Sequence, residues 1–108
     1  MPNGNIVSPA AGSAVEMTEG CFFVTGQNVG AMTDPKINRC RVYFPDGTSV
    51  QSNTAQFLGT KSWYFLFTAM GNHAGATVTI RVYNTAVGSP DTTNADDTHG
   101  GITLNNTA

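Results

Sequence analysis

The sequence predicts an all-β fold, a sandwich of antiparallel strands numbering about seven to eight. Apolar residues recur at a spacing of two, the period of a strand with one buried face, as in Val78, Ile80 and Val82. β-Branched residues, Gly and Pro interrupt every window long enough for three helical turns. A length of 108 residues suits one domain. We therefore expect a single domain over 1–108, with its core spanning about 6–104.

The first part of the chain is expected to hold three short strands. The first covers 5–8 and is closed by Pro9, which has no amide hydrogen to continue a ladder. The second covers 14–18. The third covers 20–25, includes Cys21-Phe22-Phe23-Val24, and is expected to end at Gly26.

The middle of the chain alternates strands with turn signals. A strand over 37–44 has apolar residues at 40, 42 and 44, and Pro45-Asp46-Gly47 after it is typical of a turn into a partner strand over 48–51. The most hydrophobic segment, 62–69, places Trp63, Phe65 and Phe67 on one side. Two glycines within 70–75 predict a hairpin connection to the next strand.

The last part of the chain holds the clearest strand and the longest polar interval. The strand covers 76–83, with Val78, Ile80 and Val82 on its buried side. Residues 84–100 include Pro90, Gly88 and three acids, so this interval is predicted to be a loop. A final short strand is expected over 101–104.

Composition excludes two classes of partner. The net charge of −2 with only five basic residues argues against a nucleic-acid partner, because binding a phosphate backbone relies on several Lys or Arg contacts. No apolar stretch approaches the roughly 18 to 20 residues of a membrane span, so membrane insertion is not expected. The start Met1-Pro2-Asn3-Gly4 lacks the regions of a signal peptide, so a leader was either removed or never present.

The two cysteines leave two alternatives open. Cys21 and Cys40 are too few and too far apart for a zinc site. A disulfide between them would close a loop of about 20 residues and contribute on the order of 3 kcal/mol. Two buried free thiols fit the sequence equally well, since free Cys is among the most buried residue types.

No catalytic or cofactor-binding apparatus is recognisable, so neither enzymatic activity nor a cofactor is expected. His73 and His99 are the only imidazoles, and both lie in segments predicted to be exposed loops, without a nucleophile or paired carboxylate at motif spacing. Asp91, Asp96 and Asp97 lack the spacing of a calcium loop and are expected to form a solvated acidic loop with no metal.

Several segments together resemble a bacterial or phage immunoglobulin-like domain, in which an early strand ending in Gly, a Trp-led strand and a Gly-opened penultimate strand occur in that order. They are Phe23-Val24-Thr25-Gly26, the strand over 37–44, Trp63-Tyr64-Phe65 and Gly75-Ala76-Thr77-Val78-Thr79-Ile80. The likeness covers Ile6 to Leu104, and fibronectin type III-like sandwiches share much of the pattern. Two features depart from the pattern. The Cys pair is not at the early-strand and penultimate-strand positions of antibody domains, and the Asp expected after the penultimate strand is absent. The resemblance implies a non-enzymatic module of an adhesin, a secreted or surface enzyme, or a phage structural protein.

In such a sandwich the strands over 37–44 and 76–83 pair in one sheet, which would gather polar side chains on its outer face. We call this set the Arg/Tyr wall and interpret it as a contact surface, because Arg and Tyr are enriched at interfaces; ordinary solvated cross-strand pairs are the alternative. Trp63 is expected to anchor the core rather than to stack on a sugar. The wall comprises Arg39, Arg41, Tyr43, Thr77, Thr79, Arg81 and Tyr83.

The expected role is that of an interaction or structural module displayed on an outer surface. The expected partner is a protein, such as a capsid or other surface protein. A chain that begins at Met, has no leader and is one domain long favours a virion-associated decoration or appendage protein. The alternative is a module of a secreted or cell-surface protein, an adhesin spacer or a carbohydrate-binding accessory domain, in which case the location is extracellular and carbohydrate is a ligand.

Overall fold

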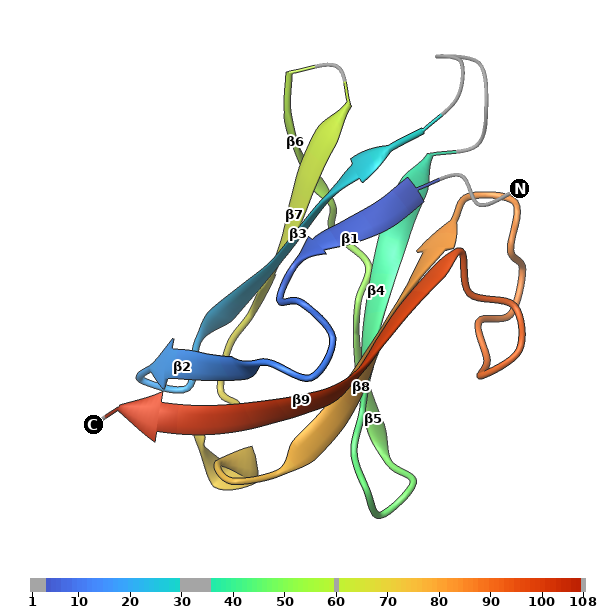
Figure 1. Cartoon of the computed structure of the whole chain (residues 1–108). Coiled ribbons are helices and arrows are strands. Elements are labelled where there is room, and N and C mark those ends of the chain that lie inside the picture. Colours follow the sequence, from blue (N-terminus) through green and yellow to red (C-terminus); the bar gives the residue numbers. More distant parts are fainter. Residues whose placement is uncertain (1–3, 30–35, 60, 108) are drawn as a thin grey trace.

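The chain folds into two packed β-sheets, which confirms the all-β prediction (Figure 1). The computed structural model describes residues 4–29, 36–59 and 61–107; the expectation for the start Met1-Pro2-Asn3 lies outside these residues. The described elements are β1 (Gly4–Ser8), β2 (Ala14–Thr18), β3 (Phe22–Asn28), β4 (Ile37–Tyr43), β5 (Ser49–Ser52), β6 (Gln56–Leu58), β7 (Ser62–Phe67), the short 3₁₀ helix η1 (Gly71–His73), β8 (Thr77–Asn84) and β9 (Asp97–Thr107).

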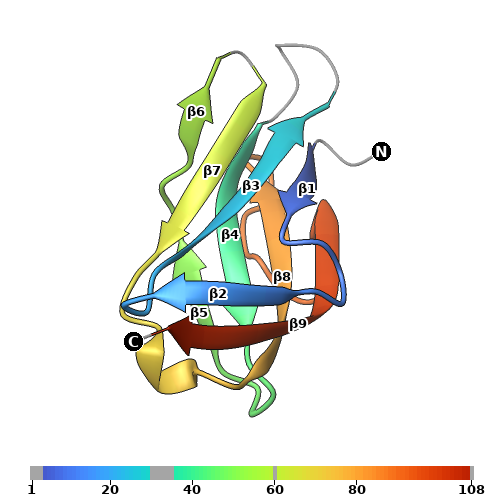
Figure 2. The ribbon, with the colours of Figure 1, turned by 60° about the vertical axis from the view of Figure 1, so that its left-hand side comes forward.

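The two sheets have distinct strand orders. Sheet A has the order β1-β3-β7-β6, and sheet B has the order β2-β9-β8-β4-β5. Figure 2 shows the first two strands in different sheets, with β1 beside β3 and β2 beside β9. All neighbours pair antiparallel except β2 and β9, which run parallel, so the expectation of a purely antiparallel sandwich is wrong at this edge.

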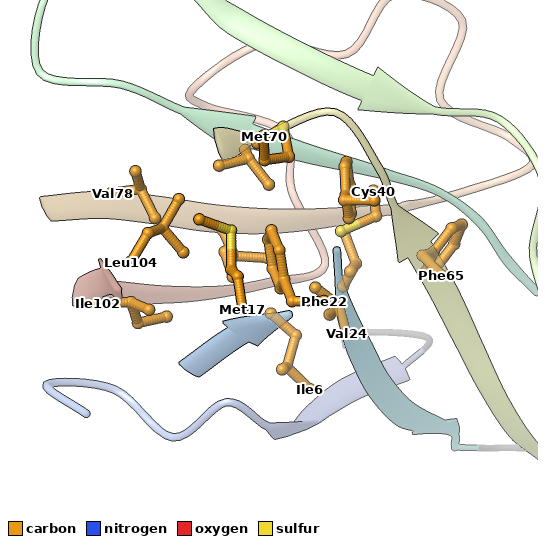
Figure 3. Close-up of a cluster of buried hydrophobic side chains, with 14 of the residues drawn as sticks. Ile6, Met17, Phe22, Val24, Cys40, Phe65, Met70, Val78, Ile102 and Leu104 are labelled. Atoms are coloured by element: carbon orange, nitrogen blue, oxygen red, sulfur yellow. The ribbon is translucent and has the colours of Figure 1, made fainter. Parts of the chain in front are cut away.

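The core lies between the sheets and is built by the alternation that the sequence shows. Apolar side chains from both inner faces point toward one another (Figure 3), and Trp63 is among the largest that are fully buried. Burying a large apolar side chain contributes roughly 1.5–3 kcal/mol, so these contacts are the main stabilising term. The core consists of Ile6, Met17, Phe22, Val24, Ile37, Cys40, Val42, Phe44, Trp63, Phe65, Phe67, Met70, Val78, Ile80, Val82, Ile102 and Leu104.

Gly26 lies inside β3 and does not end it, so the prediction that the strand stops there is wrong. A Cβ at this position would lie 2.3 Å from Cζ2 of Trp63 and 2.3 Å from the carbonyl oxygen of Asn5. The glycine is therefore needed for close approach of a ring and a backbone rather than for a turn.

The connection from β7 to β8 is also not the hairpin that was predicted. The strand β7 belongs to sheet A and β8 to sheet B, so the segment with η1 carries the chain from one sheet to the other. Met70 in this segment is buried. Gly75 has a φ of +88°, the left-handed region that glycine tolerates.

The C-terminal strand begins earlier than predicted. The polar interval expected to be a loop through Gly100 gives way at Asp97 to β9, which pairs with β8 through a register shift between Val78 and Ile80. The short strand β6 was not predicted; its three residues are all exposed, so it lacks the buried alternation that marks a strand in sequence.

The contact between Gly26 and Trp63 gives a stability prediction. Gly26→Ala is expected to lower the free energy of unfolding by about 3 kcal/mol, because the added methyl overlaps the Trp63 ring and the Asn5 carbonyl. Urea unfolding followed by tryptophan fluorescence measures the change. Gly88→Ala is the matched control, since a Cβ there meets nothing within 4 Å. Equal destabilisation by the two substitutions would contradict the packing described.

Candidate functional site

The residues of the Arg/Tyr wall lie on the outer face of sheet B, on the paired strands β4 and β8, as the sequence predicts. The strands β4 and β8 pair antiparallel, with Arg39 opposite Tyr83, Arg41 opposite Arg81 and Tyr43 opposite Thr79. The intervening residues of both strands are buried in the core. Thr77 is exposed at the start of β8. The wall is thus one continuous surface of the sheet.

The connection between β8 and β9 covers part of this wall. Residues 85–96, the orange connection between β8 and β9 in Figure 1, supply carbonyl groups to its donors. Arg39 Nη2 donates to the carbonyls of Asn84 and Val87, and Tyr83 Oη donates to the carbonyl of Asp91 at 2.6 Å. Tyr83 is 0% exposed, so the expectation of an exposed tyrosine there is wrong. The reason is that the connection folds back onto the sheet instead of extending into solvent.

Hydrogen bonds fix the ends of this connection. Asn84 is buried, and its backbone and side-chain amides donate to the carboxylate of Asp96 at 2.8 to 3.0 Å. The Asp91 carboxylate accepts from the backbone and hydroxyl of Thr93, which lowers the pKa of Asp91. Within the residues that the structure describes, no three His, Cys, Asp or Glu side chains are grouped to hold a metal.

Elsewhere on the wall, the guanidinium groups of Arg81 and Arg41 pack against the ring of Tyr43. The guanidinium carbon of Arg81 lies 4.8 Å from the ring centre of Tyr43, and that of Arg41 lies 5.8 Å from it. The hydroxyls of Tyr43 and Tyr83 are 2.8 Å apart. Burial raises the pKa of Tyr83 above its usual value, and the hydrogen bond with Tyr43 raises it further. Tyr83 therefore stays neutral at all ordinary pH values.

A second candidate surface, which was missed at the level of the sequence, is the outer face of sheet A. Phe23 is 55% exposed and Leu66 is 46% exposed, and they lie directly opposite each other on β3 and β7. Val7 and Leu58 are exposed on the outer strands β1 and β6. The strands β1, β3, β6 and β7 contain no charged residue. The sequence did contain a signal for this surface. Phe23 and Leu66 are apolar although they alternate with buried neighbours and so face the outer side of the sheet.

The orientation of two aromatic pairs bears on the expected roles of these residues. Trp63 is 1% exposed and packs edge-on against Phe65, in agreement with its expected role as a core anchor. On the outer face of sheet A, the rings of Phe23 and Tyr64 meet at 76° with centroids 5.5 Å apart. Perpendicular rings do not present the coplanar surface on which a sugar ring stacks.

Both histidines make contacts within the fold, and neither is the exposed loop residue that was expected. His73 is half-buried and stacks on Phe44, with ring centroids 3.8 Å apart. His99 lies within β9, its Nδ1 is 2.8 Å from the carbonyl oxygen of Pro9, and its Nε2 is 3.5 Å from Oδ2 of Asp97. Both rings are thus engaged in packing contacts.

Both cysteines are free thiols in the structure. Cys40 is buried in the middle of β4, and burial raises the pKa of its thiol well above the usual value. Cys21 is half-buried and lines an open cleft of about 550 Å³ between β2 and the start of β3, together with Pro9, Val15 and Phe22. The two thiols therefore differ in access to solvent.

The chain matches no protein-family model and no curated protein. Among the described residues, no helix has the length and apolar character required to cross a membrane.

The cysteine environments predict selective alkylation. Iodoacetamide at about pH 8 is expected to add one group to the folded protein, at Cys21, and two groups after unfolding in urea, because only the Cys21 thiol is accessible and burial suppresses the Cys40 thiolate. Intact-mass and peptide mass spectrometry measure the adducts, and Cys21→Ser is the control that removes the native adduct. Labelling that requires a reductant would show a disulfide and contradict the free thiols.

Because Tyr83 is buried, we expect the protein to lose stability at alkaline pH. Because the pKa of Tyr83 is raised in the folded state, its contribution is complete below about pH 10 and is lost as the pH rises above that value. Tyr83→Phe is expected to lower Tm at pH 7, since hydrogen bonds worth about 1 kcal/mol each are lost, and to flatten the fall of Tm above pH 10.

Differential scanning fluorimetry from pH 7 to alkaline pH measures both effects. Tyr64→Phe is the matched control, because it removes a tyrosine hydroxyl from the other sheet. Identical alkaline slopes for the wild type and Tyr83→Phe would contradict the burial of this side chain.

Proposed function

We propose that the chain is a non-catalytic module with an immunoglobulin-like fold that binds another protein through the outer face of sheet A. The strand orders support the immunoglobulin-like assignment. In that fold one sheet has the order first, second, fifth and fourth strand, and the other holds the third, sixth and seventh. The same orders arise here when β1, β3, β4, β6, β7, β8 and β9 are counted as the seven strands, with β2 and β5 as additional edge strands.

The observation that carries the proposed function is the outer face of sheet A, which has no charged residue on its strands and exposes a large apolar pair, Phe23 and Leu66. Soluble proteins expose single hydrophobic residues commonly, but a contiguous set on one face marks an interaction site. Phe23 and Leu66 are cross-strand neighbours, and Tyr64 contacts the ring of Phe23. A face without charges also fits the core of a protein interface, where charged residues are depleted.

The same face argues for a protein rather than other ligands. It lacks the cations that a nucleic acid requires. It also lacks coplanar exposed rings, since Phe23 and Tyr64 are perpendicular. The alternative of a carbohydrate-binding accessory domain therefore has less support than a protein-binding module.

The proposed setting is the surface of a virus particle, as a capsid decoration or appendage, which is one role that the resemblance implies. Intact-mass spectrometry of fractions from the natural source tests this setting. The expected result is that the species containing this sequence tracks at high copy number with purified particles. A species found in the envelope or the culture fluid would overturn the setting and favour a module of a surface or secreted protein.

The binding face is tested by paired substitutions. Fluorescently labelled protein is added to the fraction that contains the native species, and co-sedimentation is measured as a function of concentration. Phe23→Thr combined with Leu66→Thr is expected to raise Kd at least about tenfold, because two large apolar side chains leave the interface while both positions keep a residue suited to strands.

The control replaces two exposed apolar residues that lie outside the Phe23/Leu66 pair. Val29→Thr combined with Phe57→Thr changes two exposed residues, one beyond the end of β3 and one opposite the buried Trp63 on β6. This control is expected to bind like the wild type. Equal affinity of the wild type and the Phe23/Leu66 variant would contradict the proposed face.

A further inference from the structure

Arg81 is a cation for which the described part of the chain supplies no hydrogen-bond acceptor. Among the residues that the structure describes, none accepts a hydrogen bond from its guanidinium, and its Nε is buried without a partner. A guanidinium presents five donors, and a buried donor without a partner is costly. The side chain is nevertheless held in place, because it stacks on Tyr43.

The neighbouring arginine differs from Arg81 in this respect. Arg41 lies directly opposite on β4, and like charges directly opposite each other are destabilising. Its Nε donates to Oε1 of Gln51 at 2.9 Å and its Nη1 donates to the carbonyl of Pro90 at 3.1 Å. The acceptors of Arg41 are thus neutral, and they leave two positive charges side by side with no carboxylate bound to either.

The nearby carboxylates interact with other residues. Asp91 accepts a hydrogen bond from Thr93, and Asp96 accepts one from Asn84. Asp97 accepts from the backbone N–H of Ile6 and lies 3.5 Å from His99, the one ion pair found in the described ranges. No carboxylate of the described chain therefore neutralises Arg81.

The surroundings of Arg81 suit a planar anion. The Tyr43 ring supports one side of the guanidinium, and Thr98 faces it from β9 with an exposed side chain. Thr79, half-exposed two residues earlier on β8, offers a further hydroxyl on the same face. The terminal Nη groups of Arg81, unlike its Nε, are not among the buried unpaired atoms, and two parallel N–H groups of a guanidinium bind a carboxylate in a bidentate manner.

We propose that Arg81, supported by Tyr43, binds a carboxylate of a partner protein on the outer face of sheet B. The charge balance favours a carboxylate side chain over a phosphate backbone, because five basic residues against seven acids give a net charge of −2. This site lies on the opposite sheet from the proposed binding face and does not depend on it. Its failure would leave the function proposed for sheet A untouched.

The test uses an acidic peptide as a probe, a hexapeptide of alternating Gly and Glu, with the full chain at constant ionic strength. The ¹⁵N–¹H resonance of Arg81 Nε is followed during the titration. The resonance is expected to shift and saturate, whereas that of Arg39, whose side chain donates to the carbonyls of Asn84 and Val87, is expected to stay in place. A net acidic protein has no general attraction for this peptide.

Three variants distinguish a specific role of Arg81 from a general effect of net charge. Arg81→Gln is expected to raise Kd at least tenfold, and Arg81→Lys is expected to raise it severalfold, because an ammonium keeps the charge but loses the bidentate geometry. Lys61→Gln is the matched control, since it removes one charge from an exposed residue outside the wall and is expected to leave Kd unchanged. The amide spectrum of each variant verifies the fold.

Two outcomes would overturn the proposal. One is an equal Kd for Arg81→Gln and Lys61→Gln, which would show that only net charge matters. The other is a tighter response of Arg81 to inorganic phosphate than to the peptide at equal concentration, which would assign the site to a phosphate-type anion instead of a carboxylate.

Discussion

The hydrogen bonds between Asn84 and Asp96 decide which surfaces of this protein are open. A buried amide needs partners for each of its polar groups, and Asp96 accepts from both the backbone and the side chain of Asn84. Because these residues lie at the two ends of the connection between β8 and β9, their hydrogen bonds hold the two ends of the connection together. The connection folds back over sheet B, where its carbonyls accept from Arg39, Arg41 and Tyr83. The open part of the outer face of sheet B is the part that this connection does not cover.

The two outer faces consequently have different chemistry. Sheet A presents apolar and neutral polar groups, with Phe23 and Leu66 exposed on its two inner strands. All three arginines belong to β4 and β8 of sheet B. The connection accepts a hydrogen bond from Arg39 through the carbonyl of Val87, whereas no described residue accepts one from Arg81. Since alternate residues of a strand face opposite sides, each sheet can carry its own outer surface without any change to the shared core.

The sequence predicts the parts of the fold that follow from alternation and misses those that follow from packing between distant segments. The outward facing of Arg41 and Arg81 was predictable, since the buried positions of 37–44 and 76–83 are unambiguous. The pairing of the two strands was expected from the resemblance, and their register came only from the structure. The burial of Tyr83 was not predictable, because it depends on a loop whose polar composition is typical of a solvated segment. Gly26 shows the same limit: its role is set by Trp63, which lies 37 positions further along the chain. The crossover after β7 was misread because glycines mark a turn but do not say which sheet the next strand enters.

The separation of the two surfaces bears on how such a module would be used. An apolar face contributes affinity through desolvated area, whereas a single guanidinium that meets a carboxylate contributes orientation and selectivity more than binding energy. The two surfaces lie on opposite sheets with the core between them, so one partner does not occlude the other. In the proposed arrangement the module docks on one protein through sheet A while Arg81 contacts a carboxylate of a second. The proposed role on a particle surface needs contact with neighbouring subunits, and two surfaces of different chemistry on opposite sheets are compatible with that need.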